Sequence, residues 1–320
     1  LMRNHDEFER EIATREHINH SNVVIGVLGW HTPSGIATSG TSSDGAAGQR
    51  DAPTADDAEF PDVLVMERGG QSLFIENVTQ RIAGVNAASV ATLFRATCAQ
   101  VAALHGLGLV HGDIKLRNVI RRFGSDAVCL CDLDAAIEIG TERPTDVKVS
   151  TAYAAPEVQA SRRAKTPLEA HPSLDVWSLG VVLFELCTGR TLFAQDISND
   201  DMVEVDDETR LATWSCTPDH TLEALFSDDA AQCTPEQKRD AQHLIRWLLC
   251  GDAARRPSLA EILAHRFLGG DAGPPSMCMV VHPSSIGPSG APLEPIKALD
   301  SSRERFHVFV SHMQIEASGD

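Results

Sequence analysis

Residues 111–118 carry side chains that are suited to the transfer of a phosphoryl group. The segment reads HGDIKLRN, and a short apolar run that leads to Asp132 follows it. A carboxylate such as Asp113 can orient an attacking hydroxyl, and an ammonium such as Lys115 can neutralise charge on a moving phosphate. The amide of Asn118 and the carboxylate of Asp132 offer the oxygen ligands that Mg²⁺ prefers. Each residue taken alone fits an ordinary solvated turn, but their occurrence in this order favours the chemistry.

The residues on either side predict elements that would position this loop. Apolar residues at helical spacing over 90–104 predict a helix before it, and residues 128–131 predict a strand after it. The apolar run Val176–Cys187 predicts a buried helix. Capping-box residues that begin at Thr234 and Ser258 predict the starts of two more helices. Shorter patterns predict a helix over 6–18 and strands over 22–30 and 62–67.

Three stretches differ in composition from the densely patterned part of the chain. Residues 32–61 are mostly Ser, Gly, Ala, Thr and Asp, which predicts a disordered insertion because such residues bury little apolar surface. Residues 269–304 are rich in Pro, Ser and Gly and predict a linker. Residues 305–320 turn apolar again, and residues 306–311 predict a strand with which a further domain begins.

Composition and charge exclude several classes of protein. The 27 Lys and Arg residues against 45 Asp and Glu residues give a formal net charge of −18, so a nucleic-acid backbone would be repelled. We expect no membrane span, because no apolar run reaches the roughly 18–20 residues of a membrane helix. Eight scattered cysteines without metal-ligand spacing favour buried thiols in a reducing compartment, so we expect a cytoplasmic protein.

The ordered motifs resemble those of the protein kinase family. Residues 111–118 resemble the sequence H-R-D-L-K-x-x-N, residues 132–134 resemble D-F-G, and residues 155–157 match A-P-E. The segments around helix αC, the hinge, helix αF and the last helix are also similar, at residues 11–24, 65–67, 175–180 and 256–257. The resemblance implies an α+β, two-lobed protein kinase fold over residues 1–268, with a truncated N-terminal lobe and a mostly helical C-terminal lobe.

The resemblance also implies catalytic roles. Asp113 would accept the proton of the substrate hydroxyl, and Lys115 would contact the γ-phosphate of ATP. Asn118 and Asp132 would hold Mg²⁺. Lys115 is the residue type of serine/threonine kinases, and Ser150 stands where the substrate-binding loop of such kinases carries Ser or Thr.

Nucleotide-binding and structural roles follow in the same way. Ile120 would lie beneath the adenine, the backbone of Glu67 and Arg68 would bond to its edge, and Asn118 would also take part in binding the cofactor. Structural or regulatory roles would fall to Glu11, Ser150, Glu157, Asp175 and Arg256.

Several departures from the family pattern bear on activity. No Gly-rich loop or strand lysine precedes Glu11, so we expect this glutamate to lack its lysine partner, interpret the chain as a fragment and expect it to transfer little phosphate. Gly112 stands where other kinases have the arginine that holds a phosphorylated activation segment. The chain is therefore non-RD, and regulation through that ion pair is expected to be absent. Arg15 replaces an aliphatic residue of αC. Asp134 stands where the family has a glycine. It is either an extra metal ligand or a sign of relaxed catalysis.

The function implied is a protein serine/threonine kinase that acts in signalling on a protein substrate, with ATP and Mg²⁺. A pseudokinase or adaptor, which binds partners without phosphoryl transfer, is the alternative. The acidic stretch from Asp196 to Glu208 fits a solvated loop or a docking surface for basic peptides. Residues 306–312 are similar to the first strand of Toll/interleukin-receptor (TIR-like) domains, which predicts signalling partners for a TIR-like C-terminal module.

Overall fold

The computed structural model describes residues 5–18, 22–32, 35–38, 63–145, 147–196, 198 and 200–270. Gly269 and Gly270 are the only residues of the predicted linker over 269–304 that it describes. The remainder of that linker and the predicted TIR-like strand at 306–311 lie outside the described residues, as does most of the segment 32–61.

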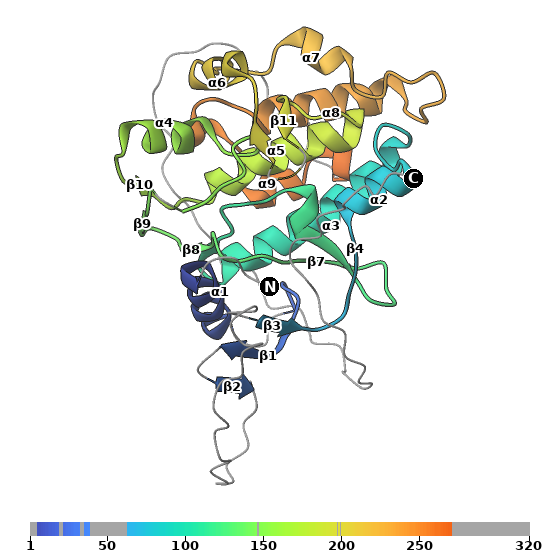
Figure 1. Ribbon diagram of the computed structural model, residues 1–320. Coiled ribbons are helices and arrows are strands. Elements are labelled where there is room, and N and C mark those ends of the chain that lie inside the picture. Colours follow the sequence, from blue (N-terminus) through green and yellow to red (C-terminus); the bar gives the residue numbers. More distant parts are fainter. Residues whose placement is uncertain are drawn as a thin grey trace, which may run out of the picture.

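A small sheet with one helix packed on it forms the N-terminal part (Figure 1). Its elements are α1 (His5–His17), β1 (Val27–Thr32), β2 (Gly35–Thr38) and β3 (Val63–Met66). The strand order is β2-β1-β3 and both pairings are antiparallel, so that Trp30 lies opposite Leu64. Phe8 of α1 is buried in an apolar cluster that also contains Leu64 and Met66 of β3. This cluster holds the helix against the sheet.

The structure differs from the predicted disorder of residues 32–61 at one place. Gly35–Thr38 form strand β2, which pairs along its whole length with the end of β1. Backbone hydrogen bonds between strands stabilise this segment, whereas the prediction considered only how little apolar surface its side chains can bury. Residues 39–61 lie outside the described residues.

The C-terminal part is mostly helical and contains the main hydrophobic core (Figure 1). Its α-helices are α2 (Leu73–Gln80), α3 (Ala87–Gly106), α4 (Pro156–Ala164), α5 (Ser173–Thr188), α6 (Val205–Ala212), α7 (Asp219–Glu223), α8 (Pro235–Leu248) and α9 (Leu259–Leu263). Helix α5 packs against α3 and α8, and all of its residues from Ser173 to Cys187 are buried. This is the buried helix that its nearly continuous apolar run predicts. The two parts together agree with the predicted α+β organisation, a small part with a sheet and a mostly helical part.

Short strands connect the helices and position the loops between them. They are β4 (Gly69–Ser72), β5 (Leu109–Val110), β6 (Val119–Arg122), β7 (Val128–Leu130), β8 (Ile137–Glu138), β9 (Glu142–Arg143), β10 (Leu168–Glu169), β11 (Gln195–Asp196) and β12 (Asp201–Met202). Strand β6 pairs with β4 and β7, β5 with β8, and β9 with β10. The last two pairings hold the segment between β7 and α4 against the rest of the C-terminal part. Short 3₁₀ helices are η2 (Leu116–Asn118), η3 (Ala253–Arg255) and η4 (Arg266–Leu268).

Helix starts agree with the capping signals of the sequence. The side chain of Thr234 accepts a hydrogen bond from the backbone of Gln237, whose side chain in turn accepts one from the Thr234 backbone. Ser258 and Glu261 form the second capping box. The helix that Ser258 begins, α9, ends at Leu263, and a separate 3₁₀ turn leads to Gly269.

Helix α3 is the one helix in the described part of the chain that is long and apolar enough to cross a membrane by length and composition. Many of its residues are Ala, which raise its hydropathy without forming a continuous run of large apolar side chains. The sequence pattern therefore did not suggest a membrane span here. In this fold α3 packs against α5, α9 and β7, and Val90, Phe94 and Val101 are buried in the main core. The central helix of a folded core has the same composition as a membrane helix.

Two helical glycines are expected to respond to alanine in opposite directions. A Cβ on Gly180 of α5 would lie 2.9 Å from Leu248 Cβ and 2.7 Å from a methyl of Leu249, so Gly180→Ala should destabilise the chain by about 1–3 kcal/mol. A Cβ on Gly106 of α3 would meet no atom within 4 Å. Gly106→Ala should therefore stabilise the chain by about 0.5–1 kcal/mol. Urea unfolding of the two variants measures both changes; equal effects would contradict the close approach of α5 and α8.

Candidate active site

The loop between β5 and η2 is held in place from below by a buried carboxylate. Asp175, in the first turn of α5, is fully buried. Its Oδ2 accepts hydrogen bonds from the backbone N–H of His111 at 2.8 Å and from His105 Nε2 at 2.8 Å, and its Oδ1 accepts one from the Gly112 N–H at 2.9 Å. Burial by itself would raise the pKa of Asp175, but these hydrogen bonds outweigh it and the pKa lies below its ordinary value.

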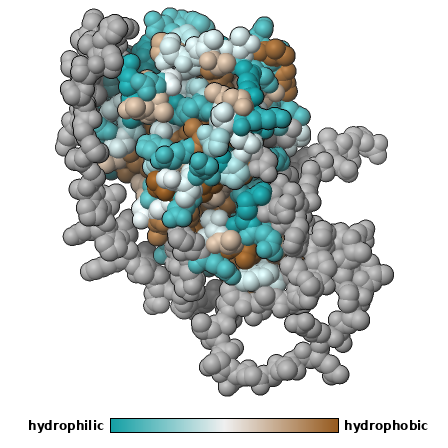
Figure 2. Space-filling model, turned by 90° about the vertical axis from the view of Figure 1, so that its left-hand side faces the viewer, coloured by the Kyte–Doolittle hydropathy of each residue, from teal (hydrophilic) through white to brown (hydrophobic). Residues whose placement is uncertain are grey.

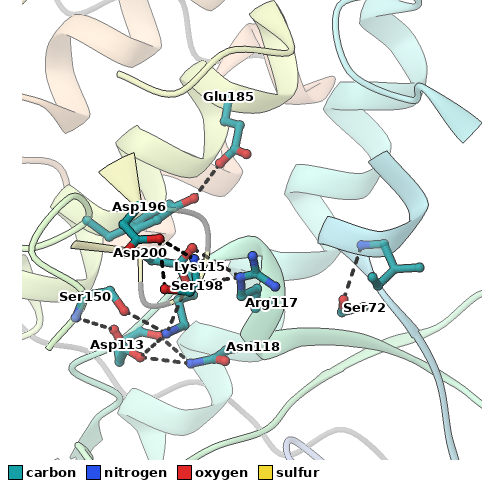
Figure 3. A network of polar contacts seen from close by, with 12 residues as sticks. Ser72, Asp113, Lys115, Arg117, Asn118, Ser150, Glu185, Asp196, Ser198 and Asp200 are labelled. Carbon is teal, nitrogen blue, oxygen red and sulfur yellow. Dashed lines mark hydrogen bonds and ion pairs between the residues drawn. The ribbon is translucent and has the colours of Figure 1, made fainter. Parts of the chain in front are cut away.

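Four of the predicted residues converge above this anchor (Figure 3). Lys115 Nζ lies 2.9 Å from Asp113 Oδ2 and donates a hydrogen bond to Ser150 Oγ at 2.7 Å. The backbone N–H of Ser150 donates to Asp113 Oδ1 at 3.1 Å. Asn118 Nδ2 donates to the backbone carbonyl of Asp113 at 2.9 Å and to its carboxylate at 3.2 Å. The carboxylate and the ammonium are therefore held in one orientation by neighbours from both sides of the loop.

The charges of Asp113 and Lys115 stabilise each other. Burial alone would raise the pKa of Asp113, but Lys115 and the hydrogen bonds from Ser150 bring it down to about 2. Burial alone would lower the pKa of Lys115, but Asp113 and Asp200 raise it above its ordinary value. At neutral pH the site therefore contains a carboxylate and an ammonium side by side.

Asn118 and Asp132 lie at the same end of the β6–β7 hairpin. The pairing of Val119 with Leu130 continues in a backbone hydrogen bond from the Cys131 N–H to the Asn118 carbonyl at 3.0 Å, and Asp132 follows directly. Asp132 has a left-handed backbone conformation, with φ of 67°. In the described part of the chain no hydrogen bond or ion pair occupies its carboxylate.

These two residues fit a divalent cation that is bound together with a nucleotide. The described residues contain no group of three or more His, Cys, Asp or Glu side chains that could enclose a metal by themselves. Mg²⁺ is ordinarily held by one or two protein oxygens together with phosphate oxygens and water. The side-chain oxygen of Asn118 and the carboxylate of Asp132 match that donor set.

Glu11 has a partner that the sequence did not suggest. Its Oε1 lies 2.5 Å from Nε of Arg15, one turn further along α1, and its Oε2 accepts a hydrogen bond from the backbone N–H of Leu133. Arg15 is buried and also donates to the Ile25 carbonyl at 2.5 Å. Glu11 therefore has no lysine partner among the described residues but is not left without a cation. Burial, the largest influence, raises the pKa of Glu11 despite the opposing charge of Arg15.

The residues predicted to surround adenine do not form an open surface. Ile120 is 1% exposed and belongs to the cluster around Phe8, so a ring stacked on Ile120 requires these neighbours to move. The backbone N–H of Glu67 already donates to the Gly26 carbonyl at 2.8 Å. The guanidinium of Arg68 stacks on the ring of Phe123, 3.6 Å from its centre.

An open hollow of about 510 Å³ lies elsewhere on the molecule. Residues 121–126 around the β6–β7 turn line it together with Gly70 and Glu76. None of the predicted catalytic or metal-binding residues belongs to its lining, so the hollow contributes nothing to the site.

Glu157 and Arg256 form an ion pair away from the loop. Arg256 donates from Nη1 to Glu157 Oε1 at 2.5 Å and from Nη2 to Oε2 at 2.8 Å, and its Nη1 also donates to the Ser173 carbonyl at 3.0 Å. The pair connects the start of α4 to the turn before α9. Its two parallel hydrogen bonds give it a defined geometry.

A second carboxylate, absent from the predicted site, also contacts Lys115. Asp200 lies in the turn of the β11–β12 hairpin, with Oδ2 3.5 Å from Lys115 Nζ, and accepts from Arg117 Nε at 3.2 Å (Figure 3). It belongs to the acidic stretch that the sequence left open between a solvated loop and a docking surface. Asp200 is buried, with 3% of its surface exposed, so at this residue the stretch is not solvated.

A buried pair lies next to Asp200. Tyr153 Oη donates a hydrogen bond to Glu185 Oε2 at 2.7 Å, and both residues are buried. Glu185 was visible in the sequence only as the charge that interrupts the apolar run of α5. Nothing in the sequence pattern indicated Tyr153, because the contact joins two segments that are distant along the chain.

Comparison with known proteins assigns the family. Residues 2–268 match the protein kinase domain, and the chain belongs to this family. Among its relatives are probable serine/threonine-protein kinase CCRP1 of Zea mays, calcium-dependent protein kinase 33 of Arabidopsis thaliana and serine/threonine-protein kinase GIN4 of Saccharomyces cerevisiae. They are 30%, 27% and 32% identical over 52%, 52% and 55% of this chain. The matched part makes up only 23%, 29% and 13% of their own lengths.

The stability of the chain should fall as Glu185 ionises. Burial raises the pKa of Glu185 from 4.5 to about 7, against the hydrogen bond from Tyr153. The folded chain therefore holds this proton more tightly than the unfolded chain, and the resulting stability, about 3 kcal/mol, is lost as the pH rises from 4.5 through 7. Urea unfolding from pH 5 to 8 measures the free energy of unfolding of Glu185→Gln and of the parent chain. The variant should become more stable relative to the parent as the pH rises. A difference in unfolding free energy that does not change with pH would contradict this.

Proposed function

We propose that this chain is the catalytic part of a protein serine/threonine kinase that uses ATP with Mg²⁺. The observation that carries the proposal is the network in which Lys115 bridges Asp113 and Ser150. It combines, in one rigid arrangement, a carboxylate that can receive a hydroxyl proton and an ammonium that can face the transferred phosphate. Membership of the kinase family and the names of the relatives support the same conclusion.

Each residue contributes through its position. The low pKa of Asp113 keeps it ionised, so it orients the acceptor hydroxyl and takes the proton late, as the oxygen bonds to phosphorus. Lys115 is charged and lies beside Asp113, where it can stabilise the equatorial oxygens of the phosphoryl group. Asn118 and Asp132 would hold the metal, which neutralises charge on the phosphates when bound. Ser150 fixes both Asp113 and Lys115 and lies beside the place of the acceptor.

The proposed setting is cytoplasmic signalling. The acceptor is a Ser or Thr side chain, because Lys115 and Ser150 are the residue types of serine/threonine kinases. A TIR-like module at the C-terminal end of the chain would supply further partners.

A pseudokinase is the second candidate, and the nucleotide side of the site favours it. Ile120 is covered by its apolar neighbours, the Glu67 N–H is used by Gly26, and Arg15 rather than a lysine holds Glu11. A nucleotide therefore has to open this region before it can bind. For the same reason we expect a low rate of phosphoryl transfer from the chain as it stands.

Phosphate transfer from γ-labelled ATP to Ser-, Thr- and Tyr-containing peptides tests the first candidate. We expect slow, Mg²⁺-dependent labelling of Ser and Thr peptides. Asp113→Asn should lower it by at least about 100-fold, because the acceptor hydroxyl loses its proton acceptor. Asp126→Asn, at an exposed aspartate of the β6–β7 turn, is the matched control and should leave the rate unchanged.

The outcomes separate the two candidates. Labelling of Tyr peptides, or labelling that survives Asp113→Asn, would refute the proposed kinase mechanism. No labelling above the Asp113→Asn background, together with no Mg²⁺-dependent stabilisation by ATP in a thermal unfolding assay, would support the pseudokinase instead.

A further inference from the structure

Asp200 contacts the catalytic loop from a segment far along the chain. It lies in the turn of the β11–β12 hairpin, and its carboxylate lies between two cations of the loop. Its Oδ2 is 3.5 Å from Lys115 Nζ and its Oδ1 is 3.2 Å from Arg117 Nε (Figure 3). The guanidinium carbon of Arg117 lies 3.7 Å from the centre of the Phe74 ring. Because only 3% of the surface of Asp200 is exposed, water screens these ion pairs little.

The backbone of Asp200 contacts the segment that follows Ser150. Its carbonyl accepts a hydrogen bond from the Ala152 N–H at 3.2 Å, and its own N–H donates to the Asp196 carbonyl at 2.8 Å. Its φ is 58°, a left-handed conformation that is uncommon for residues other than Gly but that Asp adopts more readily than most. Asp200 therefore connects the hairpin to the catalytic loop through its side chain and to the segment beside Ser150 through its backbone.

The buried position of Asp200 distinguishes it from other residues of the acidic stretch. The face of the molecule that carries α4 and α6 is largely hydrophilic (Figure 2), and Asp206 and Glu208 of α6 are exposed. Asp196, where the turn of the hairpin begins, is exposed as well. These three residues fit the solvated part of the stretch, whereas Asp200 is directed inward. Its burial therefore calls for an explanation other than solubility.

The ammonium of Lys115 has three N–H donors and, in this arrangement, three partners. Asp113 Oδ2 lies 2.9 Å from Nζ, and Ser150 Oγ accepts a hydrogen bond from Nζ at 2.7 Å. Asp200 is the third partner and the most distant one, at 3.5 Å. The three partners come from three different segments of the chain, so together they fix the position of the ammonium. Without Asp200, two partners remain and the ammonium gains freedom to move.

We propose that Asp200 is a positioning residue for phosphoryl transfer and that it acts through Lys115. This inference rests on the kinase function proposed above. Asp200 keeps the ammonium from closing on Asp113 alone and so holds one N–H in a fixed direction. Because this contact is the longest of the three, an oxygen of the phosphoryl group can take it over while the contacts with Asp113 and Ser150 persist.

Asp200→Asn tests this role, because it removes the charge, keeps the shape of the side chain and tolerates the left-handed backbone. The assay is the transfer of phosphate from labelled ATP to Ser and Thr peptides. The variant should lower kcat by about 10-fold and change the KM values for ATP and peptide by less than about 2-fold, because a misplaced ammonium affects the transition state rather than substrate binding. Asp196→Asn, at the exposed aspartate of the same hairpin, is the matched control and should leave kcat unchanged.

The Lys115 ammonium provides a second readout that does not depend on catalysis. In ¹⁵N–¹H spectra of the lysine side chains, this group should give a sharp signal in the parent chain, since its side chain is 12% exposed and has three partners. Lys115→Arg identifies the signal by its loss. Asp200→Asn should accelerate hydrogen exchange of the ammonium by at least about 3-fold, because one partner is weakened. Asp196→Asn should leave the exchange unchanged.

The outcomes separate this proposal from the proposed function. Transfer by the parent chain with the same kcat in Asp200→Asn would overturn the role of Asp200. An equal fall of kcat in Asp196→Asn would also overturn it, since the effect would then belong to the charge of the hairpin in general. If the parent chain transfers no phosphate, the kinase function fails, and the Lys115 signal still decides whether Asp200 fixes the ammonium. Unchanged exchange in Asp200→Asn, even with lower stability, would make Asp200 a purely structural residue.

Discussion

The buried carboxylate of Asp175 is the interaction on which the site depends. Its two oxygens accept from two successive backbone N–H groups of the catalytic loop, at His111 and Gly112, while its own helix is buried on all sides. The loop is thereby fixed to α5, whose residues from Ser173 to Cys187 are all buried. A loop cannot be held equally well by exposed contacts, because water competes for every donor. The directions of Asp113 and Lys115 follow from that anchor.

Positive and negative side chains alternate along a series of contacts that begins at the catalytic loop. Each charge therefore has an opposite charge beside it, which offsets the desolvation cost of burying it. Asp113, Lys115, Asp200 and Arg117 form a continuous series in which each charge touches its opposite. An isolated ion at any of these positions would carry a large desolvation cost. Glu11 follows the same rule on the other side of the site, since Arg15 supplies the cation.

The sequence predicted the parts of this structure that depend on local order. The loop at 111–118, the strand before Asp132, the buried helix α5 and the two capping boxes each arise from residues close together in the chain, so that spacing and residue type suffice. The sequence showed Arg15 as an unusual residue at an aliphatic position, but it did not indicate that Arg15 pairs with Glu11. Asp200 was visible only as one charge of an acidic stretch, because its contacts with Lys115 and Arg117 join segments that only packing brings together. Strand β2 was missed since backbone pairing leaves little trace in composition.

The position of Asp175 beneath the loop is tested most directly by hydrogen exchange at single amides. In the parent chain, the N–H groups of His111 and Gly112 should exchange as slowly as core amides, because each donates to a fully buried carboxylate. In Asp175→Asn, one of the two acceptor oxygens becomes an amide nitrogen, and exchange at these two positions should accelerate by at least about 10-fold while α3 and α8 stay protected. Unchanged protection of both amides in the variant would contradict the account.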